Sequence, residues 1–74
     1  MLTVVSQDRC MPCKMTAKKL NELGVAHNYV DVSDVPDLVK SAMDQGALAT
    51  PLVFKGREFL WSGYRPDRLA ALTA

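Results

Sequence analysis

The two cysteines of this 74-residue chain, Cys10 and Cys13, are separated only by Met11 and Pro12. This Cys-x-x-Cys motif lies between an apolar run, Leu2 to Val5, and a segment with helical periodicity. If the helix begins near Met11, residues three apart lie on one face, with Cβ atoms roughly 5–6 Å apart. A disulfide tolerates Cα separations of about 4.4–6.8 Å. The spacing therefore allows the pair to open and close as a disulfide without refolding the chain.

A helix start also makes one of the two sulfurs reactive. Unpaired N–H groups and the positive end of the helix dipole favour an anion there, and thiolates in such motifs have pKa values well below about 8.5. We predict that Cys10, the outer residue, is the nucleophile and that Cys13, which faces the core, is the resolving thiol. Pro12 suits the first helical turn because it has no N–H to lose there. Met11 would offer an apolar surface to the sulfur of a partner, and Lys14 adds a positive charge nearby.

Three other uses of the cysteine pair compete with a redox role. A structural disulfide would close a loop with only two intervening residues, which constrains little of the unfolded chain. A zinc site normally needs four ligands, whereas the chain offers two cysteines and one histidine, His27. An iron–sulfur cluster shared between two chains could use one such motif from each, but no second signal supports it. Beside a βαβ pattern a redox-active pair is favoured, and no metal site is predicted.

The composition indicates a single domain, residues 1–74, with enough apolar side chains for a core. Hydrophobic residues make up 49% of the chain, a rich share for a domain of this size. Nine Lys and Arg against eight Asp and Glu give a net charge of +1, which argues against nucleic acid as a partner. No apolar run approaches the roughly 20 residues of a membrane span, and no signal-peptide pattern is present. We expect a cytoplasmic protein without membrane association, in a compartment where cysteine pairs are catalytic rather than structural.

Periodicity and turn residues predict the element order β-α-β-α-β-β-α. The predicted strands are rich in β-branched and aromatic residues, and the helices carry apolar stripes at i, i+3 and i+4 spacing. The predicted strands are Leu2–Val5, Val25–Val32, Leu52–Phe54 and Glu58–Trp61, and the helices run from Met11 to Leu23, from Ser33 to Gly46 and from Pro66 onwards. The first βαβ unit must be parallel and right-handed, and an antiparallel hairpin follows it. The result is an α/β domain with a four-stranded mixed sheet flanked by three helices, and with the cysteine motif at the C-terminal end of the first strand.

Finer features of the later elements are also predicted. Ser33 and Asp34 are expected to cap the second helix ahead of Pro36. The second strand mixes polar and apolar residues, as expected near a sheet edge, and His27 is expected to be an exposed strand residue rather than a base, because dithiol exchange can use the thiolate directly. The residues expected to face inward are Val35, Leu38, Val39, Ala42 and Met43 on the second helix, and Leu69 and Leu72 on the last.

Three features together resemble a known family. The order of elements, the Cys-x-x-Cys motif after the first strand and Thr50-Pro51 before the third resemble the thioredoxin fold in its short, glutaredoxin form. The segment Trp61-Ser62-Gly63-Tyr64-Arg65-Pro66-Asp67 resembles the signature of NrdH-redoxins, small glutaredoxin-like proteins that behave like thioredoxins. The resemblance extends over essentially the whole chain.

The resemblance implies a dithiol–disulfide oxidoreductase with a redox-active Cys10–Cys13 disulfide and no bound cofactor. Members of this family pass electrons to the large subunit of class Ib ribonucleotide reductase. They are reduced by thioredoxin reductase, and hence ultimately by NADPH, rather than by glutathione. We therefore expect both enzymes as partners of a monomeric protein. The alternatives are a glutathione-dependent glutaredoxin and, in a different class, an iron–sulfur carrier.

The resemblance also implies which residues meet a partner. Pro51 matches the family's cis-proline beside the redox pair, and the backbone of Thr50 would hydrogen-bond an incoming chain as a short β-bridge. The other residues expected to contact a partner are Met11, Pro12, Trp61, Ser62, Gly63, Tyr64 and Arg65. Trp61 could instead be a large core residue, and Pro66 and Asp67 could serve only as a helix start. An Asp at that helix start would repel the glutathione carboxylate that bare N–H groups attract.

Pro12 departs from the pattern of the family. Family members usually carry Val or Met followed by Gln between the cysteines, whereas here a proline precedes Cys13, as in thioredoxins. We therefore hypothesise a thioredoxin-like potential, near about −270 mV rather than the roughly −200 to −230 mV of glutaredoxins. A measured potential above about −220 mV would count against this hypothesis.

Overall fold

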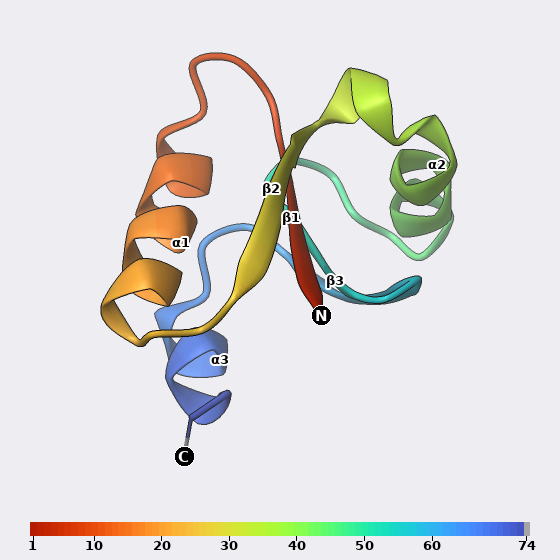
Figure 1. Cartoon of the computed structure of the whole chain (residues 1–74). Helices are drawn as coiled ribbons and strands as arrows, with labels where there is room; N and C mark the ends of the chain where they lie inside the picture. The colour runs from red at the N-terminus through yellow and green to blue at the C-terminus, as the bar shows by residue number, and fades with distance from the viewer. Residues whose placement is uncertain (74) are drawn as a thin grey trace.

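A computed structural model describes residues 1–73 and contains the predicted order of strands and α-helices (Figure 1). The elements are β1 (Leu2–Ser6), α1 (Met11–Glu22), β2 (His27–Asp31), a 3-10 turn η1 (Val32–Asp34), α2 (Pro36–Asp44), β3 (Leu52–Lys55), β4 (Glu58–Ser62) and α3 (Pro66–Ala71). The predicted α/β fold with a four-stranded mixed sheet and three α-helices is confirmed. Within residues 1–73, no helix has the length and apolar character needed to cross a membrane.

The sheet has the strand order β2-β1-β3-β4. β1 pairs in parallel with β2, while β3 runs antiparallel to both β1 and β4. β2 therefore lies at an edge, as its mixture of polar and apolar residues predicted. β1 and β3 form the centre, and their side chains are mostly buried. The cysteine motif thus follows a central, mostly buried strand of the sheet.

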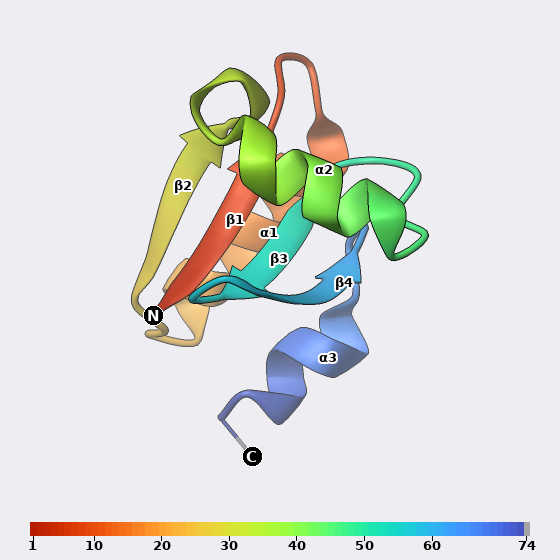
Figure 2. The same cartoon turned by 90° about the vertical axis from the view of Figure 1, so that its right-hand side faces the viewer.

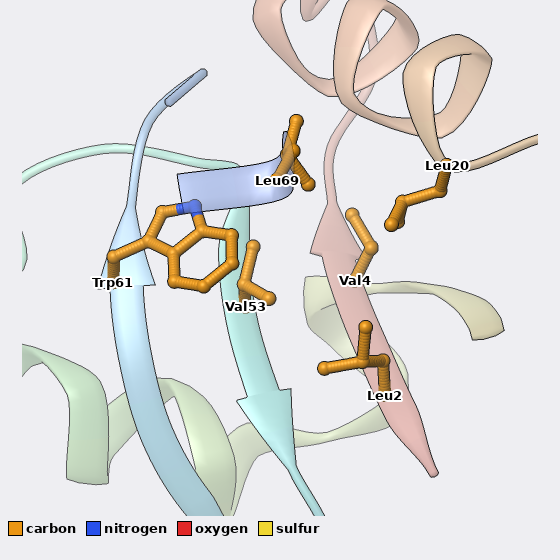
Figure 3. Close-up of a cluster of buried hydrophobic side chains, with 6 residues drawn as sticks. All are labelled: Leu2, Val4, Leu20, Val53, Trp61 and Leu69. Atoms are coloured by element: carbon orange, nitrogen blue, oxygen red, sulfur yellow. The ribbon is translucent and has the colours of Figure 1, made fainter. Parts of the chain in front are cut away.

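Helices cover both faces of the sheet (Figure 2): α1 and α3 pack on one face and α2 on the other. Successive strand residues point to opposite faces, so Val4 belongs to one core cluster and Val5 to the other. The cluster under α1 and α3 consists of Leu2, Val4, Leu20, Val53, Trp61 and Leu69 (Figure 3). The cluster under α2 consists of Val5, Ala42, Ala47, Leu52 and Phe54.

The start of the second helix differs from the prediction. Asp31 caps η1, because its carboxylate accepts from the N–H of Ser33 at 2.9 Å while the carboxylate of Asp34 accepts from the N–H of Asp31 at 3.4 Å. α2 begins only at Pro36, and its N-cap residue Val35 makes no side-chain capping bond. The expected capping of α2 by Ser33 and Asp34 was therefore wrong. The physical reason is that a residue before proline is disfavoured in the helical region, so the polar residues form a turn of their own.

β2 is also shorter than the predicted Val25–Val32. The N–H of Val25 is bonded to the carbonyl of Leu20 at 3.0 Å, which uses it to close the end of α1. Val32 belongs to η1 rather than to the strand. Val25 and Val32, the two ends of the predicted strand, thus belong to the end of α1 and to η1.

Two apolar residues predicted to face inward are exposed, Met43 at 63% and Leu72 at 38%. Ala42 fills the buried position of α2, and Met43 lies at the margin of the helix stripe beyond the second core cluster. α3 ends at Ala71, so Leu72 follows the helix, whereas Leu69 is fully buried. The helical spacing was correct, but neither residue has an element packed over it.

Candidate active site

The cysteine motif lies at the C-terminal end of β1, where the chain leaves the sheet. Residues 7–9 connect β1 to Cys10, and α1 begins at Met11 as predicted. Cys10 and Cys13 form a disulfide with Cα atoms 5.3 Å apart. Arg9, directly before the motif, has a φ of 59°, a left-handed conformation that is uncommon outside glycine. The left-handed conformation of Arg9 was not predicted from the sequence.

Cys10 is the N-cap residue of α1. Its φ and ψ of −104° and 98° lie outside the helical region, and its Sγ accepts a hydrogen bond from the N–H of Cys13 at 3.2 Å. The carbonyl of Cys10 accepts the first helical bond, from the N–H of Lys14 at 3.2 Å. The sulfur thus replaces the oxygen of an ordinary capping side chain and lies at the positive end of the helix dipole. Both effects favour a negative charge on this sulfur.

The two cysteines differ in their access to solvent. Cys13 is fully buried, whereas Cys10 is 8% exposed. Met11 and Pro12, between them, are exposed on the surface of the first helical turn. A partner that approaches over Met11 and Pro12 therefore meets the sulfur of Cys10 first.

Thr50 and Pro51 lie beside the disulfide, as the resemblance implied. The Thr50–Pro51 peptide bond is cis, and Pro51 is fully buried. The hydroxyl of Thr50 donates to the Sγ of Cys10 at 3.5 Å. Leu52 pairs with Val5 in the antiparallel register of β3 and β1, so the start of β3 meets the end of β1. That register brings Thr50 next to a cysteine 40 positions earlier in the chain.

Trp61 and Tyr64, two of the predicted partner contacts, pack into the protein. Trp61 is 5% exposed and belongs to the core cluster under α1 and α3 (Figure 3), with the guanidinium carbon of Arg68 4.8 Å from its ring centre. Within residues 1–73 its Nε1 is the one buried side-chain nitrogen or oxygen without a hydrogen-bond partner. Tyr64 packs partly buried against the same cluster. The core interpretation of Trp61 is confirmed, and contact of either side chain with a partner stays a prediction.

Gly63 connects the same segment to the disulfide end of the molecule. Ser62 pairs with Leu52 at the end of the hairpin, and the N–H of Gly63 donates to the carbonyl of Pro51 at 2.8 Å. The φ of Gly63 is +85° and a Cβ there would meet no atom within 4 Å, so glycine is needed for its conformation rather than for lack of space. The structure therefore brings together Cys10, Thr50, Pro51 and Gly63, with open space over the glycine.

Arg65 forms an ion pair with Asp67 at the start of α3. Its Nε and Nη2 donate to the two carboxylate oxygens at 3.2 and 3.0 Å. The hydrogen bond from Arg65 lowers the pKa of Asp67, and the N–H of Arg68 acts in the same direction. The hydrogen bond to Asp67 in turn raises the pKa of Arg65. The carboxylate thus occupies the first turn of α3 as predicted, but its charge is balanced by Arg65.

A buried threonine of α1, Thr16, lies one turn after the motif. Thr16 is fully buried, and its hydroxyl donates to the carbonyl of Pro12 at 2.8 Å. In a helix, a threonine hydroxyl can donate to the backbone carbonyl four residues earlier. A threonine inside a predicted helix is therefore the sequence signal for this kind of bond. The bond ties the turn that carries both cysteines to the next turn of α1.

His27 lies on β2, as predicted, and is partly exposed. Its Nδ1 is 2.9 Å from the carbonyl oxygen of Val25. Across residues 1–73, no three His, Cys, Asp or Glu side chains come together in a way that could hold a metal ion.

An apolar groove of about 310 Å³ includes Thr50 in its lining. Its lining contains no charged side chain and includes the exposed Met43 and Leu48. The lining residues are Gln7, Val32, Val39, Met43, Ala47, Leu48, Ala49, Thr50 and Leu52. The reactive end of the molecule therefore borders an open apolar surface.

Most of this chain matches known glutaredoxins. A family profile described as Glutaredoxin matches residues 2–60. The glutaredoxin-like protein NrdH of Lactococcus lactis subsp. cremoris (strain MG1363) is 39% identical over 72 residues, 97% of this chain and 99% of that protein. The protein of the same name from Salmonella typhimurium is 31% identical over 71 residues, 96% of this chain and 86% of that protein.

Solved structures agree with these sequence matches. The glutaredoxin-like protein NrdH-redoxin from Escherichia coli matches with a TM-score of 0.82 at 28% identity, over 96% of this chain and 92% of that one. That protein is described as having a thioredoxin-like activity profile. The expected fold and family are both confirmed.

Proposed function

Because this chain belongs to the glutaredoxin family, and within it to the NrdH glutaredoxin-like proteins, we propose that it carries electrons from thioredoxin reductase to class Ib ribonucleotide reductase. The chain is a glutaredoxin-like thiol–disulfide oxidoreductase with a Cys10–Cys13 disulfide. In the proposed cycle NADPH is consumed by thioredoxin reductase, and the large subunit of ribonucleotide reductase is the electron acceptor. The protein acts in the cytoplasm as a monomer and as a single domain, residues 1–74.

The reaction takes place in two exchange steps. The thiolate of Cys10 attacks one sulfur of the partner's disulfide, the partner's S–S bond breaks, and its other sulfur leaves as a thiolate. Cys13 then loses its proton, attacks the Sγ of Cys10, restores the Cys10–Cys13 disulfide and expels the partner's remaining thiolate. The partner gains two electrons and takes up protons on its thiolates, and the redoxin loses two electrons. Thioredoxin reductase returns the pair to the dithiol with electrons from NADPH.

The position of Cys10 as the N-cap of α1 is the observation that carries this assignment. Its sulfur accepts hydrogen bonds from the N–H of Cys13 and from the hydroxyl of Thr50. Cys10 is also the more exposed of the two cysteines. The buried Cys13 is covalently within reach of Cys10 but is shielded from a partner. These differences support Cys10 as nucleophile and Cys13 as resolving thiol.

The surroundings of Cys10 suit a protein substrate. We propose that the partner's chain pairs with the backbone of Thr50 beside the cis-Pro51, crosses the exposed Met11 and Pro12, and extends along the apolar groove next to Thr50. The open space over Gly63 leaves room for backbone to approach. Ser62 pairs with Leu52 at the start of β3 and so lies close to this surface, whereas Trp61 and Tyr64 pack against the core. Contact of Arg65 with the partner stays a prediction.

The start of α3 supports reduction by thioredoxin reductase rather than by glutathione. A ligand carboxylate is attracted by free N–H groups at a helix start. Here the carboxylate of Asp67 lies in the first turn of α3 and accepts two hydrogen bonds from Arg65. A glutathione carboxylate that approached this helix start would meet the negative charge of Asp67, which is paired with Arg65 at the surface.

The experiment that tests the proposal compares two reducing systems acting on the oxidised protein. One contains NADPH and thioredoxin reductase, and the other contains NADPH, glutathione and glutathione reductase. We expect rapid NADPH oxidation with the first system only, and ribonucleotide reductase becomes the acceptor to test next. The Cys10→Ser variant serves as the control, because it has the same surface and no nucleophile.

Turnover only with glutathione would make the protein an ordinary glutaredoxin and would overturn the proposal. The iron–sulfur alternative is tested on the same preparation. A coloured dimer after anaerobic purification would support a cluster, whereas a colourless monomer that resists reconstitution removes that function.

A further inference from the structure

The hydroxyl of Thr50 is the only side-chain group within residues 1–73 that donates a hydrogen bond to Cys10. Its Oγ1 lies 3.5 Å from Sγ, and the N–H of Cys13 is the other donor, at 3.2 Å. The partner role assigned to Thr50 so far uses its backbone, which leaves the hydroxyl unexplained. Valine has nearly the same shape as threonine and would fill the same space without donating.

Neighbouring structure on both sides holds Thr50 in this position. Leu52 pairs with Val5 in the centre of the sheet, and the carbonyl of Pro51 accepts from the N–H of Gly63 at 2.8 Å. Pro51 itself is fully buried. The contact between Thr50 and Cys10 therefore follows from the register of β3 rather than from a free loop.

The strength of this hydrogen bond depends on the redox state of Cys10. A disulfide sulfur is a weak neutral acceptor, whereas a hydrogen bond to an ionised group is roughly twice as strong as a neutral one. Cys10 is only 8% exposed, so water replaces a missing donor poorly. The hydroxyl thus stabilises the thiolate more than it stabilises the disulfide.

We propose that Thr50 is a catalytic residue whose hydroxyl donates to the thiolate of Cys10 and increases the reactive fraction at neutral pH. The proton stays on the threonine oxygen throughout. The electron pair of Cys10 forms the new S–S bond with the partner, and the partner's own S–S bond breaks. This inference rests on the proposed role of Cys10 as the nucleophile.

The thermodynamic consequence has a definite sign. Because the hydroxyl favours the thiolate over the disulfide, its removal should make the disulfide relatively more stable and the potential more negative. A threefold to tenfold change in the exchange equilibrium corresponds to about 15–30 mV for a two-electron couple.

The test compares Thr50→Val with Thr50→Ser, which keeps the hydroxyl. The rate of iodoacetamide alkylation of each reduced protein is measured against pH, and the modified cysteine is identified by peptide mass spectrometry. For Thr50→Val we expect a roughly threefold to tenfold slower reaction at neutral pH and a midpoint about half to one pH unit higher. Thr50→Ser should stay close to the unmodified protein in both quantities.

The same ionisable groups surround Cys10 in all the variants, so their effects cancel in the comparison. Those nearest to it in the chain are Asp8 and Arg9 on the loop before it, and Cys13 and Lys14 on α1. A merely structural threonine would change the rate at every pH without moving the midpoint. Thr50→Ala provides a second variant without the hydroxyl if the valine does not fold.

The outcomes separate this inference from the proposed function. Alkylation of Cys10 with an unchanged midpoint and potential in Thr50→Val would overturn the role of Thr50 and leave the nucleophile assignment intact. Alkylation of Cys13 in the unmodified protein would instead overturn the nucleophile assignment, and the role of Thr50 with it.

Discussion

Cys10 and Cys13 have opposite surroundings although they lie on one turn of α1. Cys10 caps the helix and receives two hydrogen bonds at its sulfur. Cys13 is fully buried and adjoins the buried Thr16 on the inner face of the helix. The sulfur with donors is suited to carry charge, and the one without access is suited to react only with its neighbour. The different roles proposed for Cys10 and Cys13 thus follow from their positions on α1.

The Cys13→Ser variant should stop the reaction after its first step. Its Cys10 can still attack a partner disulfide, but no thiol remains to release the product, so a covalent complex accumulates. Turnover should fall by at least about a hundredfold, as is typical when one member of a catalytic unit is removed. Non-reducing electrophoresis and intact-mass measurement with oxidised ribonucleotide reductase large subunit would detect the complex.

Cys10→Ser is the matched control for that experiment. It should form no covalent complex and show no turnover, with an unchanged fold. A stable complex formed through Cys13 in this variant would show that the two roles are reversed.

At the scale of elements, one carboxylate caps the 3-10 turn η1 and another lies in the first turn of α3. Asp31 caps η1 and joins β2 to α2, and Asp67 lies in the first turn of α3. The side-chain hydrogen bond from Ser33 lowers the pKa of Asp31, and the backbone N–H of Ser33 adds to this. The hydrogen bond from Arg65 lowers the pKa of Asp67. Both elements are therefore stabilised by ionised carboxylates.

Acidification should weaken these two turns in a defined direction. Both folded-state pKa values lie below the ordinary value of 3.8. The stabilisation is therefore complete above that pH and is lost as the pH falls through the lower folded values. We expect the thermal midpoint to fall on acidification below about pH 4, and to fall less in an Asp31→Asn, Asp67→Asn double variant.

The single variants Asp31→Asn and Asp67→Asn show how much each carboxylate contributes to the acid-dependent fall in the thermal midpoint. The turns have no shared partner, so their effects should add. Salt near about 1 M should reduce the effect of the exposed Arg65–Asp67 pair more than that of the Asp31 cap. An acid-induced loss that is identical in the double variant and the unmodified protein would contradict the assignment.

At the scale of the whole molecule, the sheet separates two core clusters, and α3 reaches only one of them. Leu69 is the fully buried residue of α3, and it packs with Val4, Leu20 and Trp61 (Figure 3). These partners come from β1, α1 and β4. Leu69 is thus the one α3 side chain in this core cluster, and Arg68 of the same helix adds a contact with the ring of Trp61.

The Leu69→Ala variant should lose about 2–5 kcal/mol of stability, because it removes a large side chain and leaves a cavity. For a domain of this size the thermal midpoint should fall by at least about 8 °C. Leu72→Ala is the matched control, since Leu72 is exposed beyond the end of the helix, and it should change stability by less than about 1 kcal/mol. Similar losses for both variants in thermal unfolding would show that the C-terminal helix is packed differently.

The sequence by itself determined the elements that depend on local chemistry. The cysteine spacing, Pro12 and the apolar stripe placed the start of α1 at Met11 and its end near Leu23, and Gly24 follows with a φ of +70°. Runs rich in β-branched and aromatic residues located all four strands, and the order of elements with the Cys-x-x-Cys motif and Thr50-Pro51 was specific enough to indicate the family. These features are readable because periodicity, capping and turn preferences act between residues close together in the chain.

Only the tertiary structure decided which distant residues meet and which faces are covered. The register of β3 against β1 brings the hydroxyl of Thr50 to Cys10, and packing directs Trp61 into the core. Met43 and Leu72 satisfy the helical spacing yet remain exposed, because burial depends on whether another element lies above a side chain. The local pattern specifies a face, but only the packing of the whole chain determines what that face touches.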